Sequence, residues 1–150
     1  MVYRPYIPED FAQLYAIEEI CFQPPFRFGR RYMRNLAGSA GTATWIAEGT
    51  GGMAGFAIAE WNRESGVSTA YLQTLEVLPE FRRQGVAREL LARIEGSATA
   101  AGVELIWLHV DAENAGAIRL YEARGFRCEG REENYYPKGR DGLIYVKALV

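Results

Sequence analysis

Residues 72–101 read LQTLEVLPEFRRQGVARELLARIEGSATAA, and the rest of the chain is organised around this stretch. Its first part, Leu72–Leu78, is rich in apolar and β-branched residues, which favours a strand. Pro79 ends that strand because proline cannot donate to a sheet ladder. Apolar residues then recur at helical spacing, at Leu90, Leu91 and Ile94. The stretch therefore predicts a strand, a tight basic turn and an amphipathic helix that begins near Gly85.

The turn between this strand and this helix, Arg82–Ala87, is a candidate anion site. Unpaired backbone N–H groups and the positive end of the helix dipole meet at a helix N-terminus. Gly85 and Ala87 leave room for a phosphate to approach the main chain, while Arg82 and Arg83 add positive charge. From the residues alone, an ordinary strand-to-helix turn with a solvated basic pair explains the pattern equally well.

Length and composition set the class of protein. A chain of 150 residues predicts one domain, residues 1–150, able to bury a core. A net charge of −2 argues against nucleic acid as the main partner. No apolar run is long enough to cross a membrane, and the N-terminus lacks the apolar segment of a secretory signal. We therefore expect a cytoplasmic protein with no membrane partner.

Cysteine and histidine usage argues against disulfide and metal chemistry. Cys21 and Cys128 lie far apart in the sequence and form no CxxC pair, so two reduced thiols are the simpler interpretation. With one histidine and no Cys/His cluster, we expect no metal site. The sequence leaves the oligomeric state open between a monomer and a homodimer.

The spacing of apolar residues predicts an element order of β-α-α-β-β-β-α-β-α-β-β. The predicted strands are Val2–Ile7, Thr42–Glu48, Met53–Trp61, Val67–Leu78, Glu104–Val110, Phe126–Tyr136 and Leu143–Val150. The predicted helices begin at Pro8, Arg30, Gly85 and Asn114 and end near Cys21, Ala37, Gly102 and Gly125. The predicted connections include a glycine hairpin at 49–52, a polar turn at Asn62–Ser68 and a loop at 137–142.

Two further features of the fold follow from these elements. A strand–helix–strand unit is nearly always right-handed and parallel, so the central helix predicts a parallel crossover in the sheet. The nearly continuous apolar run ELIWLHV at Glu104–Val110 predicts a central strand that is buried on both faces.

The motif Arg82-x-x-Gly85-x-Ala87 between a strand and a helix resembles the pyrophosphate loop of the GCN5-related N-acetyltransferase (GNAT) superfamily. The element order and the segment LHVDAENAGAIRLYEARGF are similar to that family as well. The resemblance covers nearly the whole chain. It implies an α/β, GNAT-like single domain, with a central mixed sheet of about seven strands flanked by about four helices. The branch it resembles most is the N-terminal protein acetyltransferases of the ribosomal-protein-alanine type.

The resemblance implies acetyl-CoA as co-substrate and no metal, with several segments in contact with the coenzyme. Backbone groups of Leu75, Glu76 and Val77 are expected to pair with the pantetheine amides, and the Val77 N–H to receive the oxyanion of the tetrahedral intermediate. The loop residues expected around the diphosphate are Arg82, Arg83, Gln84, Gly85, Val86 and Ala87. Asn114 is expected both to cap a helix and to bond the pantetheine arm.

His109 is the first candidate for the general base. An α-amino group has a pKa of about 7.7–8 and an imidazole one of about 6.5, so imidazole is suited to take the amine proton near neutral pH. From the residue alone, a core histidine or one at a frayed strand end is the better explanation. The bacterial branch often has glutamate at this position, and the eukaryotic N-terminal acetyltransferases more often have histidine.

Three more residues are candidates for the chemistry. Tyr71 resembles a tyrosine that partners the histidine in one of those eukaryotic enzymes, although core packing is its default explanation. Glu76 is a third candidate base, which shares a strand face with Tyr71 only if the strand is bulged. The resemblance places the Tyr121 hydroxyl at the coenzyme sulfur, where it would protonate the leaving thiolate.

The acceptor is expected to bind between two aromatic segments. Phe22, Pro24, Tyr135 and Tyr136 either pack at the edge of the fold or form a narrow apolar slot that admits a peptide N-terminus and excludes internal lysines. The sequence therefore predicts an acetyl-CoA-dependent N-acetyltransferase acting on the α-amino group of a protein or peptide N-terminus by direct attack in a ternary complex. Two alternatives remain open: acetylation of a small-molecule amine, and a non-catalytic domain that senses acetyl-CoA.

Overall fold

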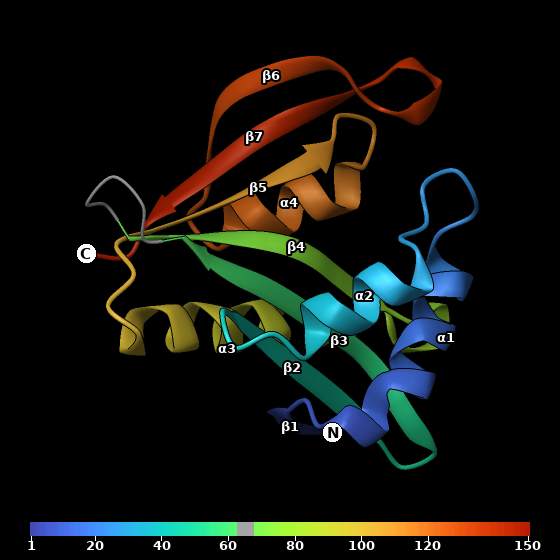
Figure 1. Ribbon diagram of the computed structural model, residues 1–150. Helices are drawn as coiled ribbons and strands as arrows, with labels where there is room; N and C mark the ends of the chain where they lie inside the picture. Colours follow the sequence, from blue (N-terminus) through green and yellow to red (C-terminus); the bar gives the residue numbers. More distant parts are fainter. Residues whose placement is uncertain (63–67) are drawn as a thin grey trace.

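The computed structural model describes residues 1–62 and 68–150. In that part of the chain one seven-stranded sheet has the order β1-β2-β3-β4-β5-β7-β6 (Figure 1). The strands are β1 (Val2–Pro5), β2 (Thr42–Gly49), β3 (Gly52–Asn62), β4 (Thr69–Val77), β5 (Leu105–Asp111), β6 (Arg127–Tyr136) and β7 (Arg140–Ala148). The helices are α1 (Phe11–Cys21), α2 (Arg30–Ala37), α3 (Val86–Ala100) and α4 (Ala115–Ala123).

This architecture confirms the predicted fold class and element order, with differences at some boundaries. A 3-10 turn (Pro8–Asp10) precedes α1, so the first α-helix begins later than expected. β7 begins at Arg140, three residues before the predicted start, because the connection from β6 is only a 3-10 turn (Pro137–Gly139). Most of the predicted turn at Asn62–Ser68 and the predicted start of β4 at residue 67 lie outside the described residues.

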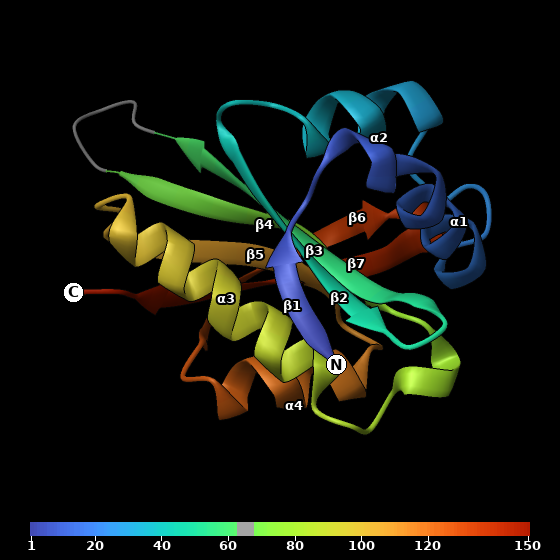
Figure 2. The ribbon, with the colours of Figure 1, turned by 90° about the horizontal axis from the view of Figure 1, so that it is seen from below.

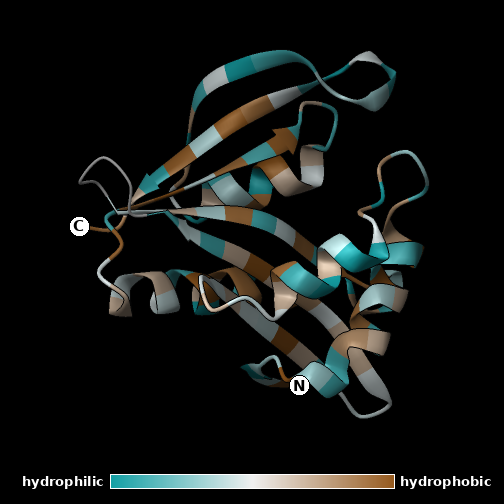
Figure 3. Ribbon diagram, in the orientation of Figure 1, coloured by the Kyte–Doolittle hydropathy of each residue, from teal (hydrophilic) through white to brown (hydrophobic). Residues whose placement is uncertain are grey.

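Helices cover the sheet on both faces (Figure 2). α1 packs on β3 and β4 and α2 on β2, whereas α3 packs on the opposite face against β2, β3 and β4. Each face has its own apolar cluster. The α1–α2 cluster includes Leu14, Met33, Ile46 and Phe56. The α3–α4 cluster includes Leu90, Leu91, Ile94, Ile106 and Leu108. β6 lies at the edge of the sheet beyond the helices, and its residues are mostly hydrophilic (Figure 3).

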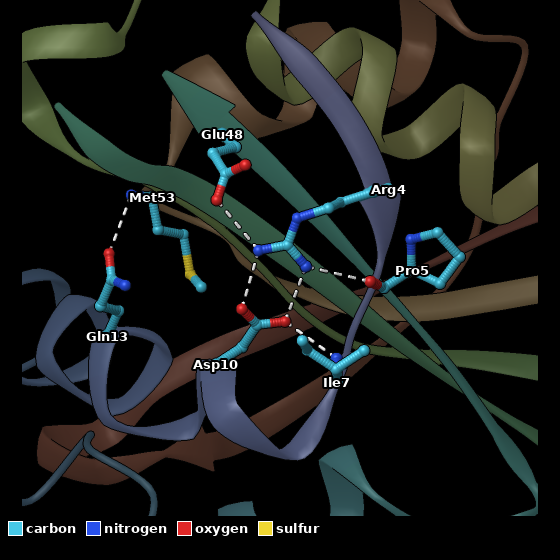
Figure 4. Close-up of polar contacts among 7 residues, drawn as sticks. All are labelled: Arg4, Pro5, Ile7, Asp10, Gln13, Glu48 and Met53. Atoms are coloured by element: carbon cyan, nitrogen blue, oxygen red, sulfur yellow. Dashed lines mark hydrogen bonds and ion pairs between the residues drawn. The ribbon is translucent and has the colours of Figure 1, made fainter. Parts of the chain in front are cut away.

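A polar cluster fixes the N-terminal strand to the rest of the domain (Figure 4). The Arg4 guanidinium donates two hydrogen bonds of 2.8 Å to the Asp10 carboxylate and a third, of 3.0 Å, to Glu48 on β2. Asp10 is buried and also accepts the backbone N–H of Ile7. The guanidinium beside it holds the pKa of the Asp10 carboxyl below its usual value. This cluster therefore sets the position at which α1 leaves β1.

β4 contains one extra residue relative to its neighbour β3. Ile58 pairs with Thr74 and Ala59 with Leu72, which leaves Gln73 as the additional residue of a β-bulge. Such a bulge shifts the alternation of side chains between the two faces of the strand by one position. A side chain that follows Gln73 therefore points to the opposite face of the sheet from the one it would occupy in a regular strand.

β4 and β5 are the parallel pair that the sequence predicts, but they pair over only three residues each. Thr69–Tyr71 align with Leu105–Trp107, and no further register is formed between these two strands. From that point the strands diverge, and the edge of β4 loses its partner. The divergence creates the opening in which the candidate site lies.

The prediction that β5 is buried on both faces is wrong. Buried residues alternate along the strand with half-buried ones. Ile106, Leu108 and Val110 pack into the α3–α4 cluster. Trp107 and His109 point to the other face, where α1 and α2 cover β2, β3 and β4 but leave β5 uncovered. The apolar side chains of this second face line a cleft.

Candidate active site

A cleft of about 1630 Å³ opens beside the diverging strands β4 and β5. Its walls come from the end of α1 and the following loop, from β4, β5 and α4, and from the connection between β6 and β7. Of the residues predicted to bind the acceptor, Phe22, Tyr135 and Tyr136 line the cleft, and Pro24 is not among its lining residues. The two aromatic segments that the sequence places 110 residues apart thus border one cavity.

Two of the predicted bases meet directly in this cleft. The Tyr71 hydroxyl lies 2.7 Å from His109 Nδ1. The other ring nitrogen, Nε2, lies 2.9 Å from the Glu132 carboxylate on β6. The His109 side chain is 7% exposed, while that of Glu132 is 48% exposed and reaches the solvent. The parallel register of Tyr71 with Trp107 brings Tyr71 and His109 together across β4 and β5.

Aromatic rings hold the imidazole in place. The Tyr135 ring stacks on His109 with a centroid distance of 3.9 Å and an interplanar angle of 7°. The Trp107 ring contacts Tyr71 edge-on at 4.6 Å. Burial raises the pKa of the Tyr71 hydroxyl well above its usual value, and the neighbouring Tyr135 hydroxyl adds to this effect. Tyr71 is therefore a neutral phenol that can donate and accept a hydrogen bond.

Glu76 lies on the same face of β4 as Tyr71. The two residues share this face because the strand is bulged at Gln73, as the prediction from the sequence required for both to act together. The structure nevertheless gives Glu76 other partners. Its carboxyl is buried beside Glu18 of α1 and accepts a hydrogen bond from the Thr74 hydroxyl. Burial and the adjacent Glu18 raise the pKa of Glu76 well above its usual value. Glu76 has no contact with His109 among the described hydrogen bonds, and its assignment as a base stays a prediction.

Tyr121 and Asn114 line the same cleft, on α4 and directly before it. The Asn114 side chain accepts the Ala117 N–H at 3.1 Å, which confirms it as the N-cap of α4. Tyr121 is 7% exposed and lines both the cleft and the α3–α4 cluster. Burial raises the pKa of its hydroxyl well above the usual value, so the group keeps its proton and stays available as a donor.

The basic turn before α3 adopts the left-handed conformation that an anion-binding loop uses. Gly85 has φ = +81° and Arg83 φ = +61°. A Cβ on Gly85 would meet no atom within 4 Å, so the space in front of the turn is open. The Arg82 guanidinium donates to the Val77 carbonyl at 2.9 Å, and the Gln84 side chain donates to the Glu80 carbonyl. These two side chains therefore tie the turn to the carbonyl groups of the segment that precedes it.

Val86 and Ala87 form the first turn of α3, whose early N–H groups have no partner within the helix. The turn fits the diphosphate of a coenzyme. It combines a left-handed glycine with open space before it, a basic side chain at Arg83 and several main-chain N–H donors. The free edge of β4 continues the same path towards the cleft.

The main chain of β4 presents donors to the cleft. Leu78 donates its N–H to Ala54 of β3 at 2.9 Å. Because consecutive N–H groups of a strand point to alternate sides, the N–H of Val77 points away from β3, to the side from which β5 has diverged. Leu75 has the same orientation and lines the cleft. The edge of β4 can therefore pair with an extended amide-containing arm.

Fold and site together define an acetyltransferase. Residues 11–126 match the family described as "Acetyltransferase (GNAT) family", and the chain belongs to this family of acetyl-CoA-dependent N-acetyltransferases.

Two curated bacterial relatives carry a more particular name. The chain is 40% identical over 98 residues to the [ribosomal protein bS18]-alanine N-acetyltransferase of Escherichia coli K12, a match that spans 64% of each protein. It is 30% identical over 140 residues to the protein of the same name in Haemophilus influenzae, covering 91% of this chain and 90% of that one.

Solved structures agree with this similarity. The ribosomal-protein-S18-alanine N-acetyltransferase of E. coli superposes with a TM-score of 0.87 at 28% identity, covering 99% of this chain and 93% of that one. Arabidopsis thaliana NAA60 in complex with a bisubstrate analogue superposes with a TM-score of 0.88 at 25% identity, covering 98% and 97%.

Sequence reasoning missed Glu132, Trp107 and the Glu18–Glu76 pair. Glu132 lies in a charged edge strand, and nothing in the local sequence indicates that it meets a histidine 23 residues earlier. Among residues 1–62 and 68–150, no group of three or more His, Cys, Asp or Glu side chains could hold a metal ion. Over the same residues, no helix is both long and apolar enough to cross a membrane.

Proposed function

We propose that the protein transfers an acetyl group from acetyl-CoA to the α-amino group of a protein or peptide N-terminus. The observation that carries this proposal is the contact between the Tyr71 hydroxyl and His109 Nδ1, 2.7 Å, in a cleft bordered by Phe22, Tyr135 and Tyr136. A tyrosine–histidine pair acting as general base suits an α-amine. The pKa of an α-amine is about 7.7–8, which is far closer to the imidazole pKa of about 6.5 than the lysine pKa of about 10.4 is.

The amine proton reaches His109 through Tyr71 in this proposal. Both imidazole nitrogens already have partners, Tyr71 at Nδ1 and Glu132 at Nε2. The Tyr71 oxygen accepts the proton of the attacking amine as its own proton passes to Nδ1. Tyr71 gains one proton from the amine and gives one to the imidazole of His109, so its phenol stays neutral throughout. This route suits a hydroxyl whose raised pKa disfavours a phenolate.

The other steps use the opposite end of the cleft. Acetyl-CoA supplies the activated thioester, with its diphosphate at the turn Arg82–Ala87 and its arm along Leu75–Val77 and Asn114. The N–H of Val77 stabilises the charge that develops on the carbonyl oxygen, an interaction worth about 3–4 kcal/mol in comparable sites. The Tyr121 hydroxyl donates a proton to the departing sulfur, and the proton held on His109 replaces it by way of solvent, so that no phenolate remains in the buried site. Holding both reactants side by side removes the entropic cost of their encounter.

A peptide acetylation screen tests the proposal. Purified protein and acetyl-CoA are presented with an array of peptides that vary in their first residues, with N-terminally blocked copies that keep an internal lysine, and with a panel of small amines. We expect acetylation of free N-termini and little of the blocked peptides. Turnover confined to small amines, or coenzyme binding without any turnover, would contradict the proposal and favour the alternatives.

A further inference from the structure

Glu132 is the outer member of a hydrogen-bonded chain that begins in the cleft at Tyr71 and passes through His109. We propose that Glu132 is a positioning residue: it holds His109 in the tautomer that carries its proton on Nε2, so that Nδ1 is free to accept the proton of Tyr71. The inference rests on the proposed function for its catalytic meaning, but the tautomer itself is a property of the free protein.

Hydrogen-bond chemistry fixes the direction of this chain. A carboxylate only accepts hydrogen bonds, so the contact of 2.9 Å between Glu132 and Nε2 requires the proton on Nε2. A neutral imidazole with its proton on Nε2 has an acceptor at Nδ1. The Tyr71 hydroxyl, 2.7 Å away, must then donate to it. The opposite tautomer would place the lone pair of Nε2 against a carboxylate oxygen and lose this hydrogen bond.

The backbone of β6 is shaped to place Glu132 and Tyr135 on the same imidazole. The pairing of β6 with β7 shifts its register between Cys128 and Gly130, is regular from Gly130 to Glu132, and resumes only at Tyr136 opposite Arg140. Between Glu132 and Tyr136 the chain departs from the register, with Asn134 at φ = +55°. As a result the carboxylate meets the edge of the ring while the Tyr135 ring lies over its face.

Asp141 of β7 holds this irregular segment in place from the partner strand. Its carboxylate accepts the backbone N–H of Asn134 at 2.9 Å and the Arg131 side chain at 2.8 Å. These contacts lie on either side of Glu132 in the sequence. They lower the pKa of Asp141, the hydrogen bond from Asn134 having the larger effect. The position of the Glu132 carboxylate is therefore determined by the fold of the hairpin.

The role of Glu132 during turnover follows from the same geometry. When Tyr71 passes its proton to Nδ1, His109 carries a proton on both nitrogens and a positive charge. The Glu132 carboxylate then faces the Nε2–H of the imidazolium and stabilises it. Glu132 keeps its own charge and forms no bond to the substrate, so it acts entirely through the ring. In hydrolase triads on unrelated folds a carboxylate likewise fixes the tautomer of a histidine and stabilises its imidazolium, while the histidine takes the proton of a hydroxyl group.

Nuclear magnetic resonance of the single histidine tests the inference without any substrate. The two ring nitrogens are resolved by ¹⁵N chemical shifts, recorded in a series of rising pH up to the plateau at which the shifts no longer change and the ring is neutral. In the wild-type protein we expect one dominant tautomer with its proton on Nε2. Glu132→Ala should produce a mixture of the two forms, and Glu132→Gln, which keeps an acceptor oxygen, should restore the Nε2–H form. A dominant Nε2–H tautomer in Glu132→Ala would overturn the inference.

Kinetics provide a second readout, and Glu133→Ala is the matched control because it removes the neighbouring exposed carboxylate. We expect Glu132→Ala to lower kcat by about 10- to 100-fold, less than the roughly 10²- to 10⁴-fold contribution of a general base because Glu132 only positions that base, with the KM for acetyl-CoA changed less than about twofold. Glu132→Gln should recover part of the loss. Equal losses in Glu132→Ala and Glu133→Ala would overturn the assignment. If the wild-type protein acetylates no peptide, the proposed function fails, and the tautomer measurement still decides the role of Glu132.

Discussion

The two ends of the cleft differ in the groups that they present: main-chain groups at one end and side chains at the other. At the coenzyme end, where we propose that acetyl-CoA binds, the turn before α3 and the free edge of β4 present main-chain groups, and the key conformation is that of Gly85. At the acceptor end, where we propose that the amine binds, side chains from three strands meet: Tyr71 of β4, His109 of β5 and Glu132 of β6. Substitution therefore removes a reacting group directly at the acceptor end, but acts mainly through backbone conformation at the coenzyme end. The difference predicts separate kinetic signatures for the two regions.

The largest effect should come from the acceptor end. We expect His109→Gln to lower kcat by about 10²- to 10⁴-fold, because no group remains to take the proton from Tyr71. The KM for acetyl-CoA should change little, since the coenzyme end is untouched. Steady-state kinetics with a peptide acceptor measure both constants. A small loss of kcat would shift the base to Glu76 or to a chain of water molecules, and would erase the distinction drawn between the two ends.

Tyr121 should give the next largest effect, because it serves the junction of the two ends. Tyr121→Phe keeps the ring in the α3–α4 cluster and removes only the hydroxyl. We expect kcat to fall by about 10²-fold, at the low end of what a general acid contributes, with nearly unchanged affinity for acetyl-CoA. Calorimetric titration with acetyl-CoA gives the affinity. An equal loss of affinity and rate would reassign Tyr121 to structure.

Gly85 tests the coenzyme end. A residue with a Cβ at φ = +81° pays a strain of about 1–2 kcal/mol, so Gly85→Ala should raise the KM for acetyl-CoA by about 5- to 30-fold with little change in kcat. Gly96→Ala is the matched control: it makes the same change inside α3, where a Cβ also meets nothing within 4 Å but the backbone is helical. Similar KM values for the two variants would show that the turn does not bind the coenzyme.

Glu76 should affect stability and its pH dependence. Its carboxyl is buried next to Glu18 with a raised pKa, so above the unfolded value of about 4.3 the folded protein holds a proton that the unfolded chain releases. Stability therefore falls as pH rises through this range. Glu76→Gln cannot titrate, and its amide can donate to Glu18 while its oxygen accepts from Thr74.

We accordingly expect Glu76→Gln to be more stable than the wild type by about 1–2 kcal/mol at pH 8, with the difference shrinking towards pH 5. Chemical denaturation at several pH values measures this, with the exposed Glu129→Gln as a control for the loss of one charge. A large fall in kcat in Glu76→Gln would instead support Glu76 as a base and extend the catalytic region beyond His109.

Local sequence patterns were enough to predict several turns and caps. The glycine of the basic turn, the Asn114 cap and the glycine hairpin at 49–52 each depend on residues close together in sequence, and the structure contains all three. The acceptor end depends on which strands neighbour one another. His109 meets Glu132 only because β7 lies between β5 and β6, with Gly142 opposite both Asp111 and Glu132.

The two-sided burial predicted for β5 failed for a related reason. The run ELIWLHV is apolar on both faces, and composition cannot distinguish a face covered by a helix from one that lines a cleft. The bulge at Gln73 was foreseen only as a condition for Tyr71 and Glu76 to share a face. Its cause, the count of residues in β3 against β4, is a property of the paired strands and not of either sequence alone.

The Phe26 ring has a consequence for how the cleft opens. It lies 5.4 Å from the Arg140 guanidinium and 5.8 Å from the Lys138 ammonium, so the loop after α1 touches the connection between β6 and β7. Exposed cation–aromatic contacts are worth about 0.5–1 kcal/mol each, and two of them favour the joined form by about a factor of 5 to 30. By these two contacts alone, roughly 3 to 17% of molecules would have the two loops apart at any moment. The contacts of Phe26 therefore hold the loop after α1 against the connection between β6 and β7 only weakly.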